Sequence, residues 1–342
     1  MGGNSISKEV KIITNEISIK PNNYKELFSN NSFNDSKIKI KEIGSKGKKS
    51  LQFKYPKSIF FDEKNEIILI SDYFNNRIQI INSINFEFIN FIDNNGEGSN
   101  ENQFWYPQGI NINQNNQNIF ICDSQNNRIK IYENFSSSNS NSSKIKFLNL
   151  FNFYLNQKNE KINFNNPNQI EIDYLNDQIL ISNRLNNEIL ILNSSFNFIF
   201  SINQKNKFNN DDNELIRARE IKLNSQNEII ISDSKNISYF NSFSSNFDFL
   251  FSINKENFGK NNRNSMIYFT IDYFDNLIVS DYYDNSIKFF NPNGNLISSF
   301  GNGKGSNLNQ FNFPLGICFG NKNQNSILIC DSGNHKIKII DW

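Results

Sequence analysis

The fold is decided by the stretch Ile327-Leu328-Ile329-Cys330-Asp331, a short apolar run that ends in an acid, together with five related stretches. The related stretches are Ile68-Leu69-Ile70-Ser71-Asp72, Ile119-Phe120-Ile121-Cys122-Asp123, Ile179-Leu180-Ile181-Ser182-Asn183, Ile229-Ile230-Ile231-Ser232-Asp233 and Leu277-Ile278-Val279-Ser280-Asp281. Their last residues are spaced by 51, 60, 50, 48 and 50 positions. A repeat of about 50 residues is typical of propeller blades, which contain four strands each.

Each repeat unit can be divided into four expected strands. The first follows a proline in four units, at Pro56, Pro107, Pro167 and Pro314, while Ala218 and Met266 take that position in the others. The β-branched run is the second strand, with both faces buried. The third alternates apolar and polar residues, as in residues 77–81, and the fourth is aromatic, as in residues 86–92.

The last unit stops after its third strand, at residues 336–342, whereas residues 37–44 alternate like a strand and have no unit of their own. We therefore expect residues 37–44 to complete the last blade, which leaves no long unpaired edge. The predicted fold is all-β: a six-bladed β-propeller of four-stranded antiparallel blades over residues 37–342. Residues 1–36 form an N-terminal extension that the sequence defines poorly.

Composition argues against several classes of protein. The 35 Lys and Arg residues balance 34 Asp and Glu residues, so we expect no DNA and no membrane partner. Three cysteines cannot form a disulfide framework, and the chain begins without the apolar segment of a secretory signal, so we expect a cytoplasmic protein. Whether Gly2 is lipidated stays open, because Ile6 departs from the myristoylation pattern.

Several motifs recur in the same order in the last and second units. The last unit has Phe300-Gly301-Asn302-Gly303-Lys304-Gly305, then Phe313-Pro314-Leu315-Gly316-Ile317, and then the dipeptide Asn334-His335. The second unit repeats the order with Gly96-Glu97-Gly98, Tyr106-Pro107-Gln108-Gly109-Ile110 and Asn126-Asn127-Arg128. The fourth unit keeps little more than Asp233.

In these motifs the chain resembles the NHL-repeat family of six-bladed propellers, and the resemblance implies an interaction platform. In tripartite-motif proteins such propellers follow a RING module and bind RNA or protein, and some relatives are amidating lyases. A lyase site of that type needs several histidines, whereas this chain has His335 alone, and its cysteines are too scattered for a RING. We therefore expect a non-enzymatic, monomeric scaffold without cofactor or metal, which binds a protein partner and recruits substrates in a ubiquitin-ligase pathway.

The candidate binding face follows from the topology. In an antiparallel blade, the loop that enters the first strand and the turn from the second to the third strand lie at the same end. Residues there that could contact a partner are Lys48, Lys49, Tyr73, Phe74, Arg77, Trp105, Tyr106, Arg128, Tyr282, Tyr283 and His335. The recurring acids and amide, Asp72, Asp123, Asn183, Asp233, Asp281 and Asp331, are interpreted as structural turn caps that accept an N–H two residues on.

Two alternatives remain. The same face could bind single-stranded RNA, which requires exposed aromatic side chains beside a continuous basic stripe. The chain could instead be a metal-dependent hydrolase or lactonase, which requires Glu, Asp and Asn side chains of several blades to converge in the central channel.

Overall fold

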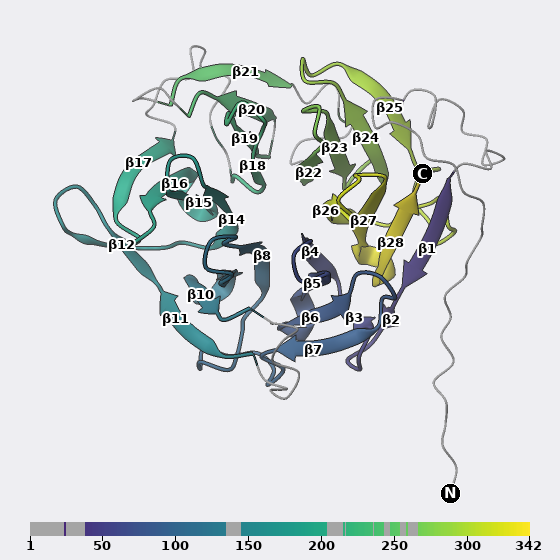
Figure 1. The fold of residues 1–342 in the computed structure, drawn as a ribbon, viewed down its shortest axis with the longest axis horizontal. Coiled ribbons are helices and arrows are strands. Elements are labelled where there is room, and N and C mark those ends of the chain that lie inside the picture. Colours follow the sequence, from purple (N-terminus) through teal and green to yellow (C-terminus); the bar gives the residue numbers. More distant parts are fainter. Residues whose placement is uncertain are drawn as a thin grey trace, which may run out of the picture.

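A computed structural model describes residues 24, 38–134, 145–203, 215, 217–234, 236–242, 247–253, 258 and 266–342. In these residues, six four-stranded antiparallel sheets surround a central axis, as Figure 1 shows. The first strand of each unit lies nearest the axis, and the aromatic fourth strand lies at the rim. The six-bladed propeller predicted from the repeat is therefore confirmed.

The first three blades have the strands expected from their repeats. Blade 1 contains β4 (Pro56–Asp62), β5 (Ile67–Asp72), β6 (Arg77–Asn82) and β7 (Phe88–Ile92). Blade 2 contains β8 (Pro107–Ile112), β9 (Ile119–Asp123), β10 (Arg128–Tyr132) and β11 (Phe147–Phe151). Blade 3 contains β14 (Pro167–Asp173), β15 (Gln178–Asn183), β16 (Glu188–Asn193) and β17 (Phe198–Asn203).

The last three blades follow the same order. Blade 4 contains β18 (Ile221–Leu223), β19 (Ile229–Ser232), β20 (Ile237–Phe240) and β21 (Phe249–Ile253). Blade 5 contains β22 (Ile267–Ile271), β23 (Leu277–Asp281), β24 (Ser286–Phe290) and β25 (Leu296–Phe300). Blade 6 contains β26 (Pro314–Phe319), β27 (Ser326–Asp331), β28 (Lys336–Asp341) and β1 (Lys39–Ile43).

The fold also contains short strands outside the blades and one-turn 3-10 helices. Two pairs of short strands lie outside the blades: β2 (Ser45–Lys46) with β3 (Gln52–Phe53), and β12 (Phe153–Leu155) with β13 (Lys161–Asn163). One-turn 3-10 helices connect second and third strands at η2 (Tyr73–Asn75), η3 (Ser124–Asn126), η4 (Arg184–Asn186) and η6 (Ser332–Asn334). No helix in the described part of the chain is long and apolar enough to cross a bilayer.

The hydrophobic core lies between the blades. Six clusters of buried side chains each combine residues of two successive blades. In β5, Ile67 and Leu69 pack toward blade 2, while Ile68 and Ile70 pack toward blade 6. Both faces of each blade are thus covered, which is why the second strands contain unbroken apolar runs rather than alternation.

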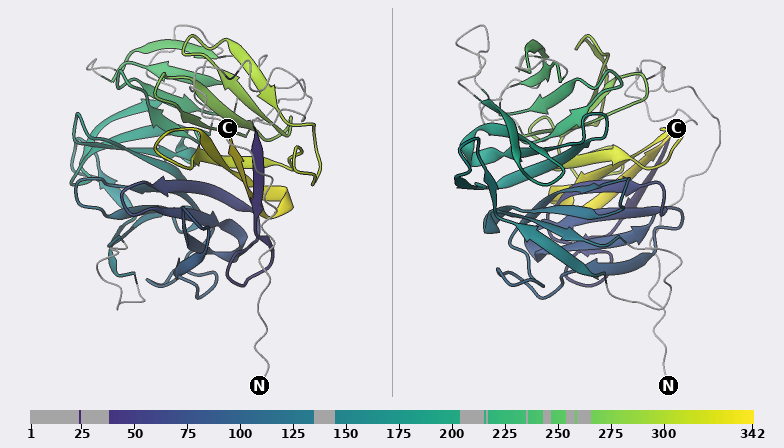
Figure 2. Two further views of the ribbon diagram at one scale, coloured as in Figure 1. Left: turned by 45° about the vertical axis from the view of Figure 1, so that its right-hand side comes forward. Right: turned by 60° about the vertical axis from the view of Figure 1, so that its left-hand side comes forward.

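The ring closes as the sequence predicts. Strand β1 pairs antiparallel with β28, with Ile40 opposite Ile340 and Ile43 opposite Ile337. Figures 1 and 2 show this purple strand along the outer edge of the yellow blade. At the axis, β26 approaches β4 so closely that a Cβ on Gly316 would lie 2.6 Å from the carbonyl oxygen of Lys57. Glycine at this position therefore lets blades 6 and 1 meet.

A second set of contacts joins the blades near the axis. One serine hydroxyl of each blade donates to a carbonyl oxygen on the first strand of the next blade, or just before it. The pairs are Ser71 with Pro107, Ser124 with Pro167, Ser182 with Ala218, Ser232 with Ile267, Ser280 with Leu315 and Ser332 with Pro56. In blades 2 and 6, where cysteine precedes the recurring acid, the serine follows the acid instead. We call these six contacts the serine ring.

Tyr24 is the one residue of the predicted N-terminal extension that the structure describes. Its ring stacks on Phe289 with centroids 4.7 Å apart, and its hydroxyl donates to Asp272 at 2.9 Å. Burial and the negative charge of Asp272 raise the pKa of this phenol, so it stays a proton donor. The side chain of Tyr24 thus packs against blade 5.

Candidate functional site

Two arginines expected to contact a partner are buried structural residues instead. Arg77 is 1% exposed, its Nε donates to Asp72 at 2.8 Å, and its terminal nitrogens donate to the carbonyl oxygens of Lys48, Lys49 and Gln52. Arg128 is held in the same way by Asp123 at 2.7 Å and by loop carbonyls. Both guanidinium groups tie the entering loop to the turn, so they are not accessible to a ligand.

The other residues of the candidate face occupy several environments. Lys48 and Lys49 are exposed, as are Phe74, Trp105 and Tyr283 at 37%, 38% and 43%. Tyr73 stacks on Tyr106 with centroids 4.7 Å apart, and Tyr282 stacks on Phe313 at 4.4 Å. Exposed aromatic rings are therefore present on this face, and their role in binding a partner stays a prediction.

The recurring acids make a contact that differs from the expected cap. Asp72 accepts the backbone N–H of Lys54 at 2.7 Å, from the loop before the first strand. The equivalent loop N–H groups bond to Asp123, Asn183 and Asp331 at 2.6–2.7 Å. Asp233 and Asp281 accept from N–H groups three residues on, at Asn236 and Asp284. At Asp72, Asp123, Asn183, Asp281 and Asp331, whose turns are fully described, the side-chain oxygen accepts no hydrogen bond from the N–H two residues on, which differs from the expected cap.

His335 joins the last blade to the first. It has a left-handed backbone (φ 59°), and its Nδ1 accepts the N–H of Tyr55 at 3.1 Å. Four asparagines make the equivalent contact: Asn76 with Tyr106, Asn127 with Asn166, Asn187 with Arg217 and Asn285 with Phe313. Burial and nearby lysines lower the pKa of His335, so the ring is a neutral acceptor at neutral pH.

The central channel contains a chamber of about 220 Å³ that the sequence interpretation did not identify. All six blades line it, and its polar lining comes from Ser58, Gln169, Glu220, Lys222, Thr270 and Cys318. This volume is about seven times the ~30 Å³ that one water occupies in the liquid, so the chamber suits a small molecule.

Glu220 is the group in the chamber whose protonation lies near neutrality. It is 5% exposed, and its carboxylate accepts a hydrogen bond from the Gln169 amide. Burial raises the pKa of Glu220 from 4.5 to about 7, although the Lys222 ammonium opposes this shift. A carboxyl group with such a pKa exchanges protons readily at physiological pH, which is the property required of a general base.

Lys222 and Cys318 have fixed protonation states. Burial lowers the pKa of Lys222, but the charges of Glu171 and Glu220 outweigh it and hold that pKa above its ordinary value. The ammonium lies 2.8 Å from Glu171 and 3.8 Å from Glu220. Burial raises the pKa of the Cys318 thiol to about 12, so it is not a thiolate at neutral pH. Lys222 therefore supplies a positive charge, whereas Cys318 is a poor nucleophile.

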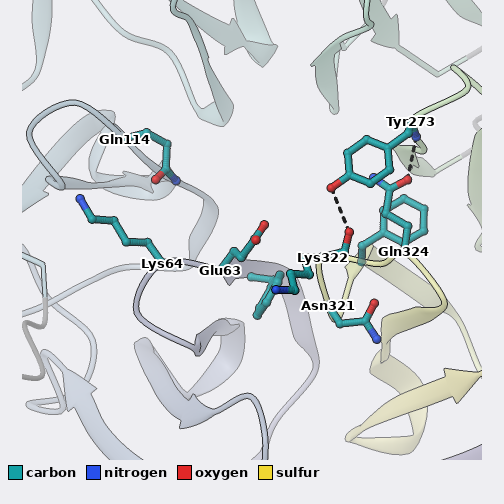
Figure 3. A pocket seen from close by; sticks show the side chains of 9 residues that line it. Glu63, Lys64, Gln114, Tyr273, Asn321, Lys322 and Gln324 are labelled. Atoms are coloured by element: carbon teal, nitrogen blue, oxygen red, sulfur yellow. Dashed lines mark hydrogen bonds between the residues drawn. The ribbon is translucent and has the colours of Figure 1, made fainter.

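A wider pocket of about 450 Å³ adjoins the chamber, and Phe61 and Phe319 line both. Figure 3 shows Lys64 and Gln114 across this pocket from Tyr273, with Glu63 between them. The Tyr273 hydroxyl donates to the carbonyl of Lys322 at 2.9 Å. These residues lie in turns that follow the first strands, so the pocket opens on the face opposite the entering loops.

The metal-site hypothesis does not fit the donors present. In the residues that the structure describes, no group of three or more His, Cys, Asp and Glu side chains could hold a metal ion. The channel carboxylates Glu171 and Glu220 instead flank the Lys222 ammonium, which would repel a cation. We therefore derive no reaction step from a metal.

A signal for the chamber was present in the sequence. Glu220 and Lys222 lie two and four positions after Ala218, which stands where four other units have proline. Glu220 directly precedes β18 and Lys222 lies within it, next to the axis. Charged residues on an innermost strand are costly to bury and therefore indicate a functional site. The sequence shows that Glu220 and Lys222 alternate with apolar residues, but it does not show which face of the strand points to the axis.

Comparison with known proteins identifies the repeat. The family model described as NHL repeat matches residues 104–132, which span the end of the entering loop, β8, β9 and β10. The chain is an NHL-repeat-containing β-propeller. No curated protein matches the sequence significantly.

Solved structures resemble this propeller over most of its length. Virginiamycin B lyase from Staphylococcus aureus is 13% identical, with 89% of this chain and 99% of that chain covered and a TM-score of 0.55. A gluconolactonase from Xanthomonas campestris is 10% identical, with 89% of both chains covered and a TM-score of 0.60. An auxiliary nutrient binding protein from Bacteroides thetaiotaomicron is 15% identical, with 84% and 69% covered and a TM-score of 0.58. At these identities the likeness is one of fold.

These comparisons correct two predictions. The chain was expected to be a non-enzymatic scaffold for a protein partner, and it was expected not to be an enzyme. Both are wrong, because similar propellers carry enzyme names, lyase and gluconolactonase. The hydrolase or lactonase alternative agrees better with these structures. The scaffold prediction failed because it rested on the scarcity of histidine, whereas the polar groups of the channel are Glu220, Gln169 and Lys222.

Proposed function

We propose that the NHL-repeat propeller is a hydrolase of small lactones and that its active site is the central chamber. The observation that carries this proposal is Glu220, a carboxyl group whose pKa is about 7 and which faces a chamber of about 220 Å³. The similarity in fold to a gluconolactonase supports the choice of substrate class. The metal-dependent form of this reaction is set aside, because the donors do not suit a cation.

In the proposed reaction, Glu220 acts as general base. Its carboxylate takes a proton from water, and the water oxygen forms a bond to the lactone carbonyl carbon. The ring C–O bond then breaks, and the protonated Glu220 returns its proton to the departing alkoxide. The products are the hydroxyl and carboxyl groups of one opened molecule, so atoms and charges balance.

Two neighbours of Glu220 have supporting roles. The Gln169 amide donates to the Glu220 carboxylate and thereby orients it. The Lys222 ammonium, held by Glu171 at 2.8 Å, supplies positive charge where the carbonyl oxygen becomes negative. Buried groups of this kind act more strongly than in water, because the local dielectric constant is low.

The test is hydrolysis of a panel of five- and six-membered lactones, followed in a pH-stat. We expect Glu220→Gln to lower kcat by on the order of 10²–10⁴-fold, since the amide cannot accept the proton. For the wild type, kcat/KM should rise with pH through about 7, because the base works when deprotonated. The exposed Glu133, mutated to Gln, is the matched control and should retain wild-type rates. Wild-type turnover in Glu220→Gln, or no lactone hydrolysed by the wild type, would reject the proposal.

A further inference from the structure

Three basic side chains from three blades lie at the end of the channel where the first strands begin. Lys57 is the second residue of β4, Arg184 begins η4, and Arg219 lies two residues before β18. Figure 1 shows β4, β14 and β18 around the axis. After burial itself, the positive charges of Arg219 and Arg184 are the main causes that lower the pKa of Lys57, so the three groups lie near one another. We call them the cationic mouth.

Among the described residues, the cationic mouth has no ion-pair partner. Arg219 is 3% exposed, and its buried Nε has no hydrogen-bond partner. The buried Nε of Arg184 is also unpartnered, although another nitrogen donates to Asn166 at 3.2 Å. Arginine stays charged at any physiological pH, and these buried, unpartnered guanidinium nitrogens are suited to bind an anion.

Tyrosine rings form part of the surroundings. The Lys57 ammonium lies 4.5 Å from the ring centroid of Tyr73, and Tyr268 is 3% exposed. Burial raises the pKa of Tyr73 to about 12 and also raises that of Tyr268, so both hydroxyls remain proton donors. Hydroxyl donors and guanidinium groups together are complementary to the oxygens of a carboxylate or phosphate.

We propose that the cationic mouth binds the anionic group, a carboxylate or a phosphate, of the small molecule that occupies the channel. The inference rests on the proposed function in one respect, that the ligand is the substrate of Glu220. Arg219 directly precedes Glu220 in the chain, so a ligand held by Arg219 would bind at the same end of the channel as Glu220. The substrate class is therefore an anionic lactone.

Calorimetric titration with paired probes tests the site. D-Gluconate and sorbitol differ in one carboxylate, while glucose 6-phosphate and glucose differ in one phosphate. We expect D-gluconate or glucose 6-phosphate, or both, to bind at least tenfold more tightly than the neutral partner, sorbitol or glucose. The stronger of the two anions identifies the group. Equal binding of anions and neutral partners would overturn the proposal.

Two variants assign the binding to the cationic mouth. Arg219→Met should weaken anion binding at least tenfold while leaving Tm unchanged or higher, because it removes an unpaired buried charge. Lys57→Met should weaken anion binding in the same direction. Lys46→Met, at an exposed lysine, is the control and should bind like the wild type. Unchanged anion binding in Arg219→Met and Lys57→Met would reject the site.

The Glu220→Gln variant separates the two proposals. It should still bind the anions while losing lactone hydrolysis. Anion binding that depends on Arg219 in a protein without lactonase activity would reject the proposed function and leave the anion site in place. Lactonase activity that depends on Glu220 but changes neither with substrate charge nor on substitution of Arg219 would support the proposed function and reject the anion site.

Discussion

Position 335 shows how one side chain can make a repeated contact sensitive to pH. Four blades use an asparagine oxygen to accept the N–H of the next blade, and blade 6 uses Nδ1 of His335. The amide of asparagine does not titrate near neutrality, whereas protonated imidazole has no acceptor. The junction between blades 6 and 1 therefore differs from the other four in its dependence on protons.

This difference predicts an acid-sensitive junction. The pKa of His335 is below its ordinary value of 6.5 in the folded protein, so the unfolded chain binds the proton more readily. The stabilisation is present above pH 6.5 and is lost as pH falls below that value. We expect His335→Asn to reduce the loss of Tm between pH 7.5 and pH 5, measured by scanning calorimetry. An identical pH dependence in the two proteins would contradict this account.

At the scale of the element, the turn between second and third strands is held by an acid and a cation. Asp72 lies opposite Arg77 in the β5–β6 register, and Asp123 lies opposite Arg128. Lysines serve in two other blades, where Lys288 contacts Asp281 at 2.8 Å and Lys338 approaches Asp331 at 3.5 Å. In blade 3 the charges are rearranged, since Asn183 donates to Glu188 at 2.7 Å.

Removing one member of such a pair should destabilise the protein strongly. Arg77→Met leaves Asp72 buried without its cation and frees three loop carbonyls, so we expect a loss of about 3–5 kcal/mol in urea unfolding. The exposed neighbour Lys49, also mutated to Met, should change stability by less than about 0.5 kcal/mol. Similar effects of the two substitutions would show that Arg77 is not structural.

The strands were predictable because their signals are local and repeated. The apolar runs and the spacing of about 50 residues define every blade, and prolines mark the first residue of β4, β8, β14 and β26. The position of strand β1 at the outer edge of blade 6 was also predictable, because the last unit lacked a fourth strand. The sequence left two possibilities for Arg77 and Arg128, pairing with a neighbouring acid or binding a ligand. The structure has the pairing, because a five-residue spacing across a tight turn sets acid and arginine opposite one another.

The chamber could not be predicted in the same way. Whether a side chain faces the axis depends on an irregularity in the first strands, where the register shifts between Pro167 and Ile170 and at equivalent positions. Likewise, the two asparagines of the first turn are alike in sequence, yet Asn76 and not Asn75 has positive φ. Features that do not repeat, such as Glu220 and Arg219, give no periodic signal.

At the scale of the whole molecule, closure makes the propeller one cooperative unit. The side chain of Ile40 on β1 is 5% exposed and packs in the cluster shared by blades 5 and 6. A closed ring leaves no blade with a free face, so damage at the closing strand is felt by all interfaces.

We therefore expect Ile40→Ala to lower the free energy of unfolding by about 2–5 kcal/mol in a single transition. The buried Trp342 reports on blade 6 when Trp105 is replaced by Phe, and circular dichroism reports on all blades. Both probes should give the same midpoint. Lys39→Ala, one residue away on the same strand, is the control and should cost less than 1 kcal/mol. Two separate midpoints would mean that blade 6 unfolds alone.

The serine ring has a consequence for how such a molecule could arise. All six junctions use one contact, a hydroxyl of one blade on the carbonyl of the following blade, whichever blades they are. The contact is the same at every junction and therefore does not specify which two blades are neighbours. A gene that duplicated or lost one 50-residue segment would encode a chain whose new neighbours already fit, so recombination could change the blade number without inventing a junction. The wedge shape of the apolar interfaces, rather than the polar contact, then fixes the count at six.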